Sequence, residues 1–128
     1  MSEWIGVPKD YTDLYGFVYI IINKKTGRKY VGKKAFWNTK KLPPLKGRKN
    51  KRHRKVESDW KSYWGSSKEL LKDKEEQGNG DFIRVVVGCA DSRSGLSFKE
   101  LTTQIGLGVL ESDEYYNGII HVRLNKTT

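Results

Sequence analysis

The sequence predicts an α+β domain in which a small three-stranded antiparallel sheet is flanked by helices. A β-hairpin pattern opens the domain, helical patterns lie on either side of a third β-branched segment, and 128 residues suit one domain. We expect residues 1–14 to form an irregular lead-in and residues 15–128 to form the domain.

The first two strands are expected at residues 17–22 and 28–32. Both segments are rich in β-branched and aromatic residues, which favour strands. The sequence NKKTG connects them, and its glycine, Gly27, supplies the permissive backbone that a tight turn needs. The two strands therefore form a predicted antiparallel hairpin.

This hairpin would place two tyrosines on one face of the sheet. Tyr19 of the first strand and Tyr30 of the second then lie close together, beside Lys33 and Lys34. A phenol among ammonium groups has its charged form favoured, so we expect lowered pKa values suited to proton transfer. Ordinary packing of both tyrosines in the sheet is the alternative.

Helices are expected between the hairpin and the third strand. Ser58 is a candidate N-cap for a short helix that ends at Gly65, and Ser66 or Ser67 is a candidate N-cap for a helix over residues 68–76. The aromatic residues of the short helix are expected in the core, with base stacking as the alternative: Trp60, Tyr63 and Trp64.

The last third of the chain is expected to contain a strand, a helix and a short final strand. Residues 82–87 are apolar and β-branched, and a helix follows over residues 97–110. Residues 119–124 are the candidate final strand. The apolar positions of the helix recur at helical spacing: Phe98, Leu101, Ile105 and Val109.

The charge is concentrated in one part of the sequence. The net charge is +10, and the stretch from Leu14 to Val56 contains fifteen Lys or Arg and no Asp or Glu. Within it, residues 38–56 read as a basic loop, partly disordered, because prolines and a glycine interrupt a run of basic residues. This density indicates a polyanionic partner, and nucleic acid is favoured over anionic membrane because no basic amphipathic helix is visible.

Composition also limits the cellular setting. No apolar run approaches the roughly 20 residues that span a bilayer, and the start of the chain is unlike a signal peptide. The one cysteine, Cys89, excludes an internal disulfide. We therefore expect a cytoplasmic protein.

A series of motifs runs through most of the chain. FVY at residues 17–19 is followed after ten residues by YVG at 30–32, and then by YWGSSKELLKDKEEQGNGDF, by FKELTTQI with Glu100 and by YYN with Asn117. The series resembles the GIY-YIG nuclease superfamily, especially its small phage-encoded, homing-endonuclease-like members. The resemblance covers about residues 16 to 120.

The resemblance implies an endonuclease that hydrolyses phosphodiester bonds in DNA with one Mg²⁺, or Mn²⁺, per active site. Glu100 would be the metal ligand, and Tyr19 the general base. Tyr30 would position the attacking water or the phosphate. Lys33 would assist the base or hold the phosphate, and Asn117 would support the site.

Two positions depart from the family pattern. Phe17 stands where the first triplet usually has glycine. Where the family usually has a helical arginine, this chain has Lys40 and Lys41. Either lysine could replace the arginine, or an arginine could come from the basic loop. The candidates in the loop are Arg48, Arg52 and Arg54.

The expected partner is DNA, with no membrane association. Sequence specificity would be low, or would come from a homodimer or a partner protein. The alternative functions are a catalytically impaired DNA-binding protein that keeps the fold, and an RNA-binding protein. The residues expected to contact DNA are Lys34, Lys46, Arg48, Lys49, Lys51, Arg52, Arg54 and Lys55, and Gly32 belongs with the site as part of the second triplet.

Overall fold

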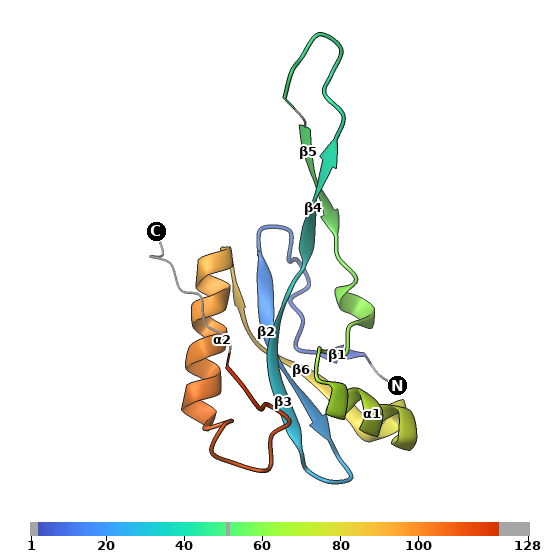
Figure 1. The fold of residues 1–128 in the computed structure, drawn as a ribbon, viewed down its shortest axis with the longest axis vertical. Coiled ribbons are helices and arrows are strands. Elements are labelled where there is room, and N and C mark those ends of the chain that lie inside the picture. Colours follow the sequence, from blue (N-terminus) through green and yellow to red (C-terminus); the bar gives the residue numbers. More distant parts are fainter. Residues whose placement is uncertain (1–2, 51, 121–128) are drawn as a thin grey trace.

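The computed structural model, which describes residues 3–50 and 52–120, has an α+β fold with two sheets (Figure 1). The larger sheet has the strand order β1-β6-β2-β3. Its strands are β1 (Trp4–Ile5), β2 (Gly16–Asn23), β3 (Lys29–Ala35) and β6 (Phe82–Ala90). Strand β2 pairs antiparallel with both β3 and β6, whereas β1 runs parallel to β6.

The predicted three-stranded antiparallel sheet is present as β6-β2-β3, but it is not the whole sheet. Strand β1 lies in the segment that we expected to be irregular, and it makes the sheet mixed. Two residues are too few to show the alternation that marks a strand. The predicted hairpin between β2 and β3 is confirmed, and Gly27 in its turn has φ of +79°.

The two faces of the sheet are covered by different elements. Helix α2 (Arg93–Leu107) covers one face, on the left in Figure 1. The other face packs against η1 (Trp60–Ser62) and α1 (Lys68–Gln77), and η2 (Asn79–Asp81) lies between α1 and β6 in the chain. Side chains of β2 point alternately to the two faces of the sheet, so the core has two clusters. Val18 belongs to the cluster beneath α2, and the cluster on the other face contains Phe17, Tyr19 and Ile21.

The helices largely follow the sequence signals. Helix α1 begins where predicted, with the hydroxyl of Ser67 accepting a hydrogen bond from the backbone N–H of Leu70 at 3.2 Å. Helix α2 begins four residues earlier than predicted because Ser92 caps it, and it ends at Gly108, whose φ is +64°. The predicted short helix is the single 3₁₀ turn η1, and β6 extends three residues beyond the predicted strand.

Two predictions at the end of the chain need correction. Phe98 and Ile105 were expected on the packed face of the last helix, but they are 53% and 62% exposed. Leu96 and Gln104 are the buried residues of α2. In the predicted final strand, residues 119 and 120 are not in a strand, and residues 121–124 lie outside the described part of the chain.

The basic segment is a hairpin. The prediction of a loop was wrong for residues 38–42 and 52–56, which are in strands, whereas residues 43–50 lie in no helix or strand. Strands β4 (Trp37–Leu42) and β5 (Arg52–Glu57) pair antiparallel and extend beyond the end of the larger sheet (Figure 1). Basic side chains are poor strand formers, so propensity gave no signal here. Among the described residues, no helix is long and apolar enough to cross a membrane.

Candidate active site

A cavity of about 230 Å³ opens at the β3 edge of the larger sheet. We call it the tyrosine cavity. Its strand residues come from β3, except for Tyr19 of β2, which lies opposite Gly32 of β3. Helix α2 and the segment between η1 and α1 also contribute side chains. It is lined by Tyr19, Tyr30, Gly32, Lys33, Tyr63, Ser66, Glu100, Gln104, Asn117 and Ile119. Six residues predicted from the sequence are thus brought together: Tyr19, Tyr30, Gly32, Lys33, Glu100 and Asn117.

Three phenols form one wall of the tyrosine cavity. The ring centroids of Tyr19 and Tyr30 are 6.2 Å apart, which confirms that the hairpin brings these two side chains together. Tyr63 packs edge-on against Tyr19, with 6.1 Å between the centroids. The hydroxyl of Tyr30 lies 3.1 Å from the hydroxyl oxygen of Ser66.

Two glycines allow the phenols to occupy these positions. Strand pairing places Gly32 opposite Tyr19, and a Cβ at Gly32 would lie 2.5 Å from the Tyr19 hydroxyl oxygen. Gly65 has φ of +85°, and a Cβ there would lie 3.3 Å from the same oxygen. The Tyr19 hydroxyl therefore lies between two backbone segments, one with no room for a Cβ at Gly32 and the other with little room at Gly65.

Helix α2 supplies the charged part of the cavity. Glu100 faces inward, with 15% of its side chain exposed, and its carboxylate lies 3.9 Å from the Lys33 ammonium. Lys33 also donates a hydrogen bond to the Ser97 hydroxyl at 2.9 Å. The carboxylate, the ammonium group and the phenols therefore share one small space that opens to solvent.

The Asn117 side chain forms hydrogen bonds with the edge of β3 in the way that the backbone of a neighbouring strand would. Its side-chain oxygen accepts a hydrogen bond from the Val31 N–H at 3.0 Å, and its amide donates to the Val31 carbonyl at 2.9 Å. Gln104 of α2 donates to the same carbonyl at 3.0 Å. These side chains satisfy backbone groups of a fully buried residue, and so fix the strand that carries Tyr30 and Gly32.

The pKa prediction for the two tyrosines was wrong. The pKa of Tyr19 is raised well above its usual value, chiefly because burial disfavours the phenolate and also because other phenols are near. Burial raises the pKa of Tyr30 as well. The nearby ammonium groups have other partners, since Lys33 binds Ser97 and Lys34 lies 2.7 Å from the Asp59 carboxylate.

Several predicted residues do not reach the tyrosine cavity. Lys40 and Lys41 lie on the exposed β4, and neither they nor the arginines of the hairpin line it. Lys34 is half-buried over the Tyr63 ring, 4.2 Å from its centroid. Lys55 donates to the Thr12 carbonyl at 2.6 Å. The predicted residue Lys51 lies outside the described part of the chain. The remaining predicted DNA contacts are exposed on the hairpin: Lys46, Arg48, Lys49, Arg52 and Arg54.

The comparison with known families agrees with this geometry. Residues 4–120 match the family model described as "Putative endonuclease segE, GIY-YIG domain". The chain belongs to the GIY-YIG nuclease superfamily. The chain has no significant match among curated proteins or among solved structures. Membership makes this a nuclease domain whose substrate class is DNA.

Sequence reasoning missed four residues of the tyrosine cavity. Tyr63 was expected in the core, Ser66 was considered as a helix cap, Ile119 was expected in a final strand, and Gln104 was not considered. The sequence YWGSS carries a signal that could have identified the first two. Its Gly65 needs a left-handed backbone that turns the chain next to the tyrosines. Gln104 follows Glu100 by one helical turn and therefore lies on the same face of α2.

The residues of the cavity fit a metal that is held by one protein ligand. Among the described residues, no group of three or more His, Cys, Asp or Glu side chains could hold a metal ion. Mg²⁺, however, is commonly bound by one or two carboxylates, with waters and substrate phosphates as the other ligands. Glu100 supplies such a carboxylate, in a cavity with room for waters and a phosphate.

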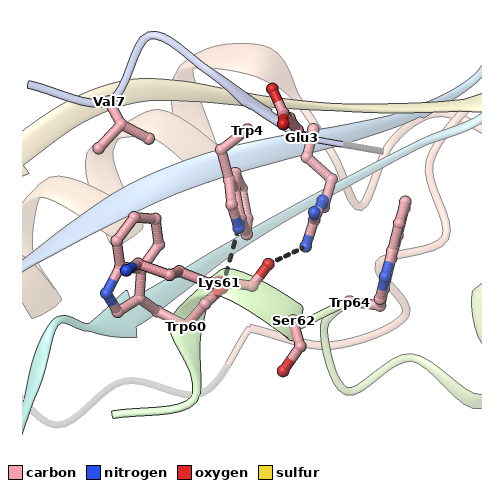
Figure 2. Close-up of a pocket in the computed structure, with 8 residues that line it drawn as sticks. Glu3, Trp4, Val7, Trp60, Lys61, Ser62 and Trp64 are labelled. Carbon is pink, nitrogen blue, oxygen red and sulfur yellow. Dashed lines mark hydrogen bonds between the residues drawn. The ribbon is translucent and has the colours of Figure 1, made fainter. Parts of the chain in front are cut away.

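A second, larger cavity of about 630 Å³ lies next to η1 (Figure 2). The Arg84 guanidinium lies between two indole rings, 4.5 Å from the Trp4 ring and 4.2 Å from the Trp64 ring. It donates hydrogen bonds to the carbonyls of Lys61 at 3.2 Å and Tyr63 at 2.7 Å. Burial lowers the pKa of Arg84 to about 10, so it stays charged at neutral pH. Arg84 thereby anchors the backbone of the segment that brings Tyr63 to the tyrosine cavity.

Proposed function

We propose that the protein is a divalent-metal-dependent endonuclease that hydrolyses phosphodiester bonds in DNA at the tyrosine cavity. The observation that carries the proposal is the meeting of Glu100, Lys33 and three phenols in one solvent-open cavity of a GIY-YIG domain. A hard oxygen ligand, a cation and hydroxyl groups are the types of group that phosphodiester hydrolysis requires.

Glu100 is the proposed ligand of one Mg²⁺ or Mn²⁺ per active site. The bound ion would polarise the phosphate and neutralise charge that develops on its oxygens. Lys33 is the proposed phosphate contact, because its ammonium group lies 3.9 Å from the Glu100 carboxylate and thus beside the position of the phosphate. Lys33 also takes the electrostatic role that an arginine has elsewhere in the family.

Tyr19 is the proposed contact of the attacking water, and Tyr30 helps to position that water or the phosphate. The raised pKa of Tyr19 keeps it a neutral phenol at neutral pH. Its proposed role therefore changes from general base to a hydrogen-bonding group that orients the water. Asn117 and Gly32 support this arrangement, Asn117 by fixing β3 and Gly32 by leaving space for the Tyr19 hydroxyl.

The biological setting is proposed from the family resemblance. A small phage-encoded, homing-endonuclease-like enzyme, acting in the cytoplasm of an infected bacterium, is the setting that we favour. Sequence specificity would then come from a homodimer or a partner protein, or would be low.

A plasmid-nicking assay tests the proposed function. Wild type should nick supercoiled plasmid in Mg²⁺ or Mn²⁺, whereas Glu100→Ala should bind DNA normally and fail to nick. Glu76→Ala removes an exposed glutamate from α1 and is the matched control, with unchanged nicking. Nicking by Glu100→Ala at the wild-type rate would exclude Glu100 as the ligand.

A second candidate function is a DNA-binding protein that has lost activity. The observation that favours it is that no arginine is among the described residues that line the tyrosine cavity. Loss of one electrostatic donor costs about 3–4 kcal/mol of transition-state stabilisation. Salt-sensitive DNA binding by wild type without nicking in either metal would support this candidate over the enzyme.

A further inference from the structure

The β4–β5 hairpin, which we call the basic ribbon, concentrates positive charge on a narrow two-stranded element. Residues 38–56 contain nine Lys or Arg and no Asp or Glu. All the charged side chains of this segment that the structure describes are exposed. Pairing places Lys40 directly opposite Arg54, and Lys41 directly opposite His53. Like charges directly opposite each other, as in the Lys40–Arg54 pair, destabilise a hairpin, so an anionic partner would stabilise this one.

The base of the basic ribbon is fixed to the core. Tyr11 stacks on Phe36 with 4.6 Å between the ring centroids, and its hydroxyl donates to the Glu57 carboxylate. Trp60 donates to the same carboxylate at 2.9 Å. The Ser58 hydroxyl donates to the carbonyl of Ala35, the last residue of β3, at 2.6 Å. An isolated two-stranded hairpin is marginally stable, and these contacts hold this one in a defined direction.

Strand alternation gives the ribbon two basic faces. Lys40, Arg52 and Arg54 belong to one face, because Lys40 pairs with Arg54 and Leu42 pairs with Arg52. Lys41 and His53 belong to the other face. A ribbon with charge on both faces is suited to a site with phosphates on two sides, which is the situation inside a groove of a duplex.

We propose that the basic ribbon enters the major groove of double-stranded DNA, so that the substrate is a B-form duplex. The proposal rests on the proposed function in taking DNA as the substrate. The major groove, about 12 Å wide, admits a two-stranded β-ribbon, whereas the minor groove is about half as wide. Strands of six residues, as in β4 and β5, are about 20 Å long. This corresponds to about six base pairs at about 3.4 Å each.

Groove entry distinguishes duplex DNA from other nucleic acids. The major groove of A-form RNA is deep and too narrow for side chains to read. A single strand has no groove at all. We therefore expect the protein to bind DNA duplex more tightly than it binds either single-stranded DNA or RNA duplex. A ribbon that only follows the charge of one backbone would not produce this order.

The test measures binding of the full chain to labelled 20-base-pair DNA in EDTA, over a range of salt concentrations. Methyl green, a major-groove ligand, should compete with wild type, and netropsin, a minor-groove ligand, should not. The triple variant Lys40→Ala/Arg52→Ala/Arg54→Ala should reduce the slope of log K against log salt by about 3, since each phosphate contact contributes about 1. It should also lose most of the preference for DNA duplex over RNA duplex.

A matched control removes the same charge from another surface. Lys24→Ala/Lys25→Ala/Lys72→Ala changes three exposed lysines of the β2–β3 turn and α1, and should keep the slope and the preference. Equal affinity of wild type for RNA and DNA duplexes would overturn the proposal. So would competition by netropsin alone, or identical behaviour of the two triple variants.

The experiments distinguish failure of the nuclease proposal from failure of the ribbon inference. A protein that does not nick in Mg²⁺ or Mn²⁺, but competes with methyl green and responds to the ribbon variant, would retain the ribbon inference and lose the nuclease proposal. A protein that nicks, but whose ribbon variant has the wild-type slope of log K against log salt, would retain the nuclease proposal and lose the ribbon inference.

Discussion

Replacing Gly32 by alanine should disable the tyrosine cavity without unfolding the protein. The added Cβ would lie 2.5 Å from the Tyr19 hydroxyl oxygen and 2.7 Å from its Cζ. Ordinary contact distances are about 3.5 Å, so the ring must move by about 1 Å. A displacement of that size at a reacting group can reduce the rate by about 100-fold. The strain should cost about 1–3 kcal/mol of unfolding free energy, or about 4 °C in Tm for each kcal/mol.

Nicking rates and thermal unfolding of Gly32→Ala, measured side by side, test this reasoning. Gly80→Ala is the control, because a Cβ at Gly80 would have no heavy atom within 4 Å. Adding Tyr19→Phe to Gly32→Ala should recover part of the lost stability, since it removes the nearest atom, but not the activity. Nicking by Gly32→Ala within about threefold of the wild-type rate would refute this reasoning, because Tyr19 could then be displaced without consequence.

Three further predictions concern stability. Asn117→Ala should cost about 1–3 kcal/mol, because it leaves the buried N–H of Val31 without its partner; denaturant unfolding would measure this, and the exposed control Asn79→Ala should change little. The raised pKa of Tyr19 stabilises the fold below the unfolded value of about 10, and this contribution is lost as pH rises through the folded pKa. Unfolding at pH 8 to 11 should therefore show a steeper loss in wild type than in Tyr19→Phe, and equal slopes would contradict the assignment. Gly106→Ala should stabilise α2 by about 0.5–1 kcal/mol, since nothing lies within 4 Å of the new Cβ, and a lower Tm would be the contrary result.

Local signals predicted the elements that depend on local chemistry. The β2–β3 hairpin follows from two β-branched segments and a glycine turn, and the meeting of Tyr19 with Tyr30 follows from strand alternation. Helix α1 was predicted from Ser66 or Ser67 as the cap and from the residues that follow, and Ser67 is the cap. Each of these features is determined by residues close together in the sequence.

Features that depend on distant contacts were not predictable in this way. The base of the basic ribbon is held by Tyr11 and Trp60, which both donate to Glu57, and nothing in residues 38–56 indicates those partners. The pKa of Tyr19 depends on burial, which a count of neighbouring lysines does not reveal. Gln104 of α2 is buried although it is polar, because it binds the Val31 carbonyl, and the spacing of apolar residues along the helix does not reveal this.

The pairing of Asn117 with Val31 links the order of synthesis to the onset of activity. Until residue 117 has left the ribosome, β3 has no partner for the Val31 N–H, and one wall of the tyrosine cavity is absent. The tyrosines, Lys33 and Glu100 all precede Asn117 in the chain, so a nascent chain can carry each of them and still lack a finished site. DNA cleavage would then begin only after nearly all of the domain has been synthesised and folded.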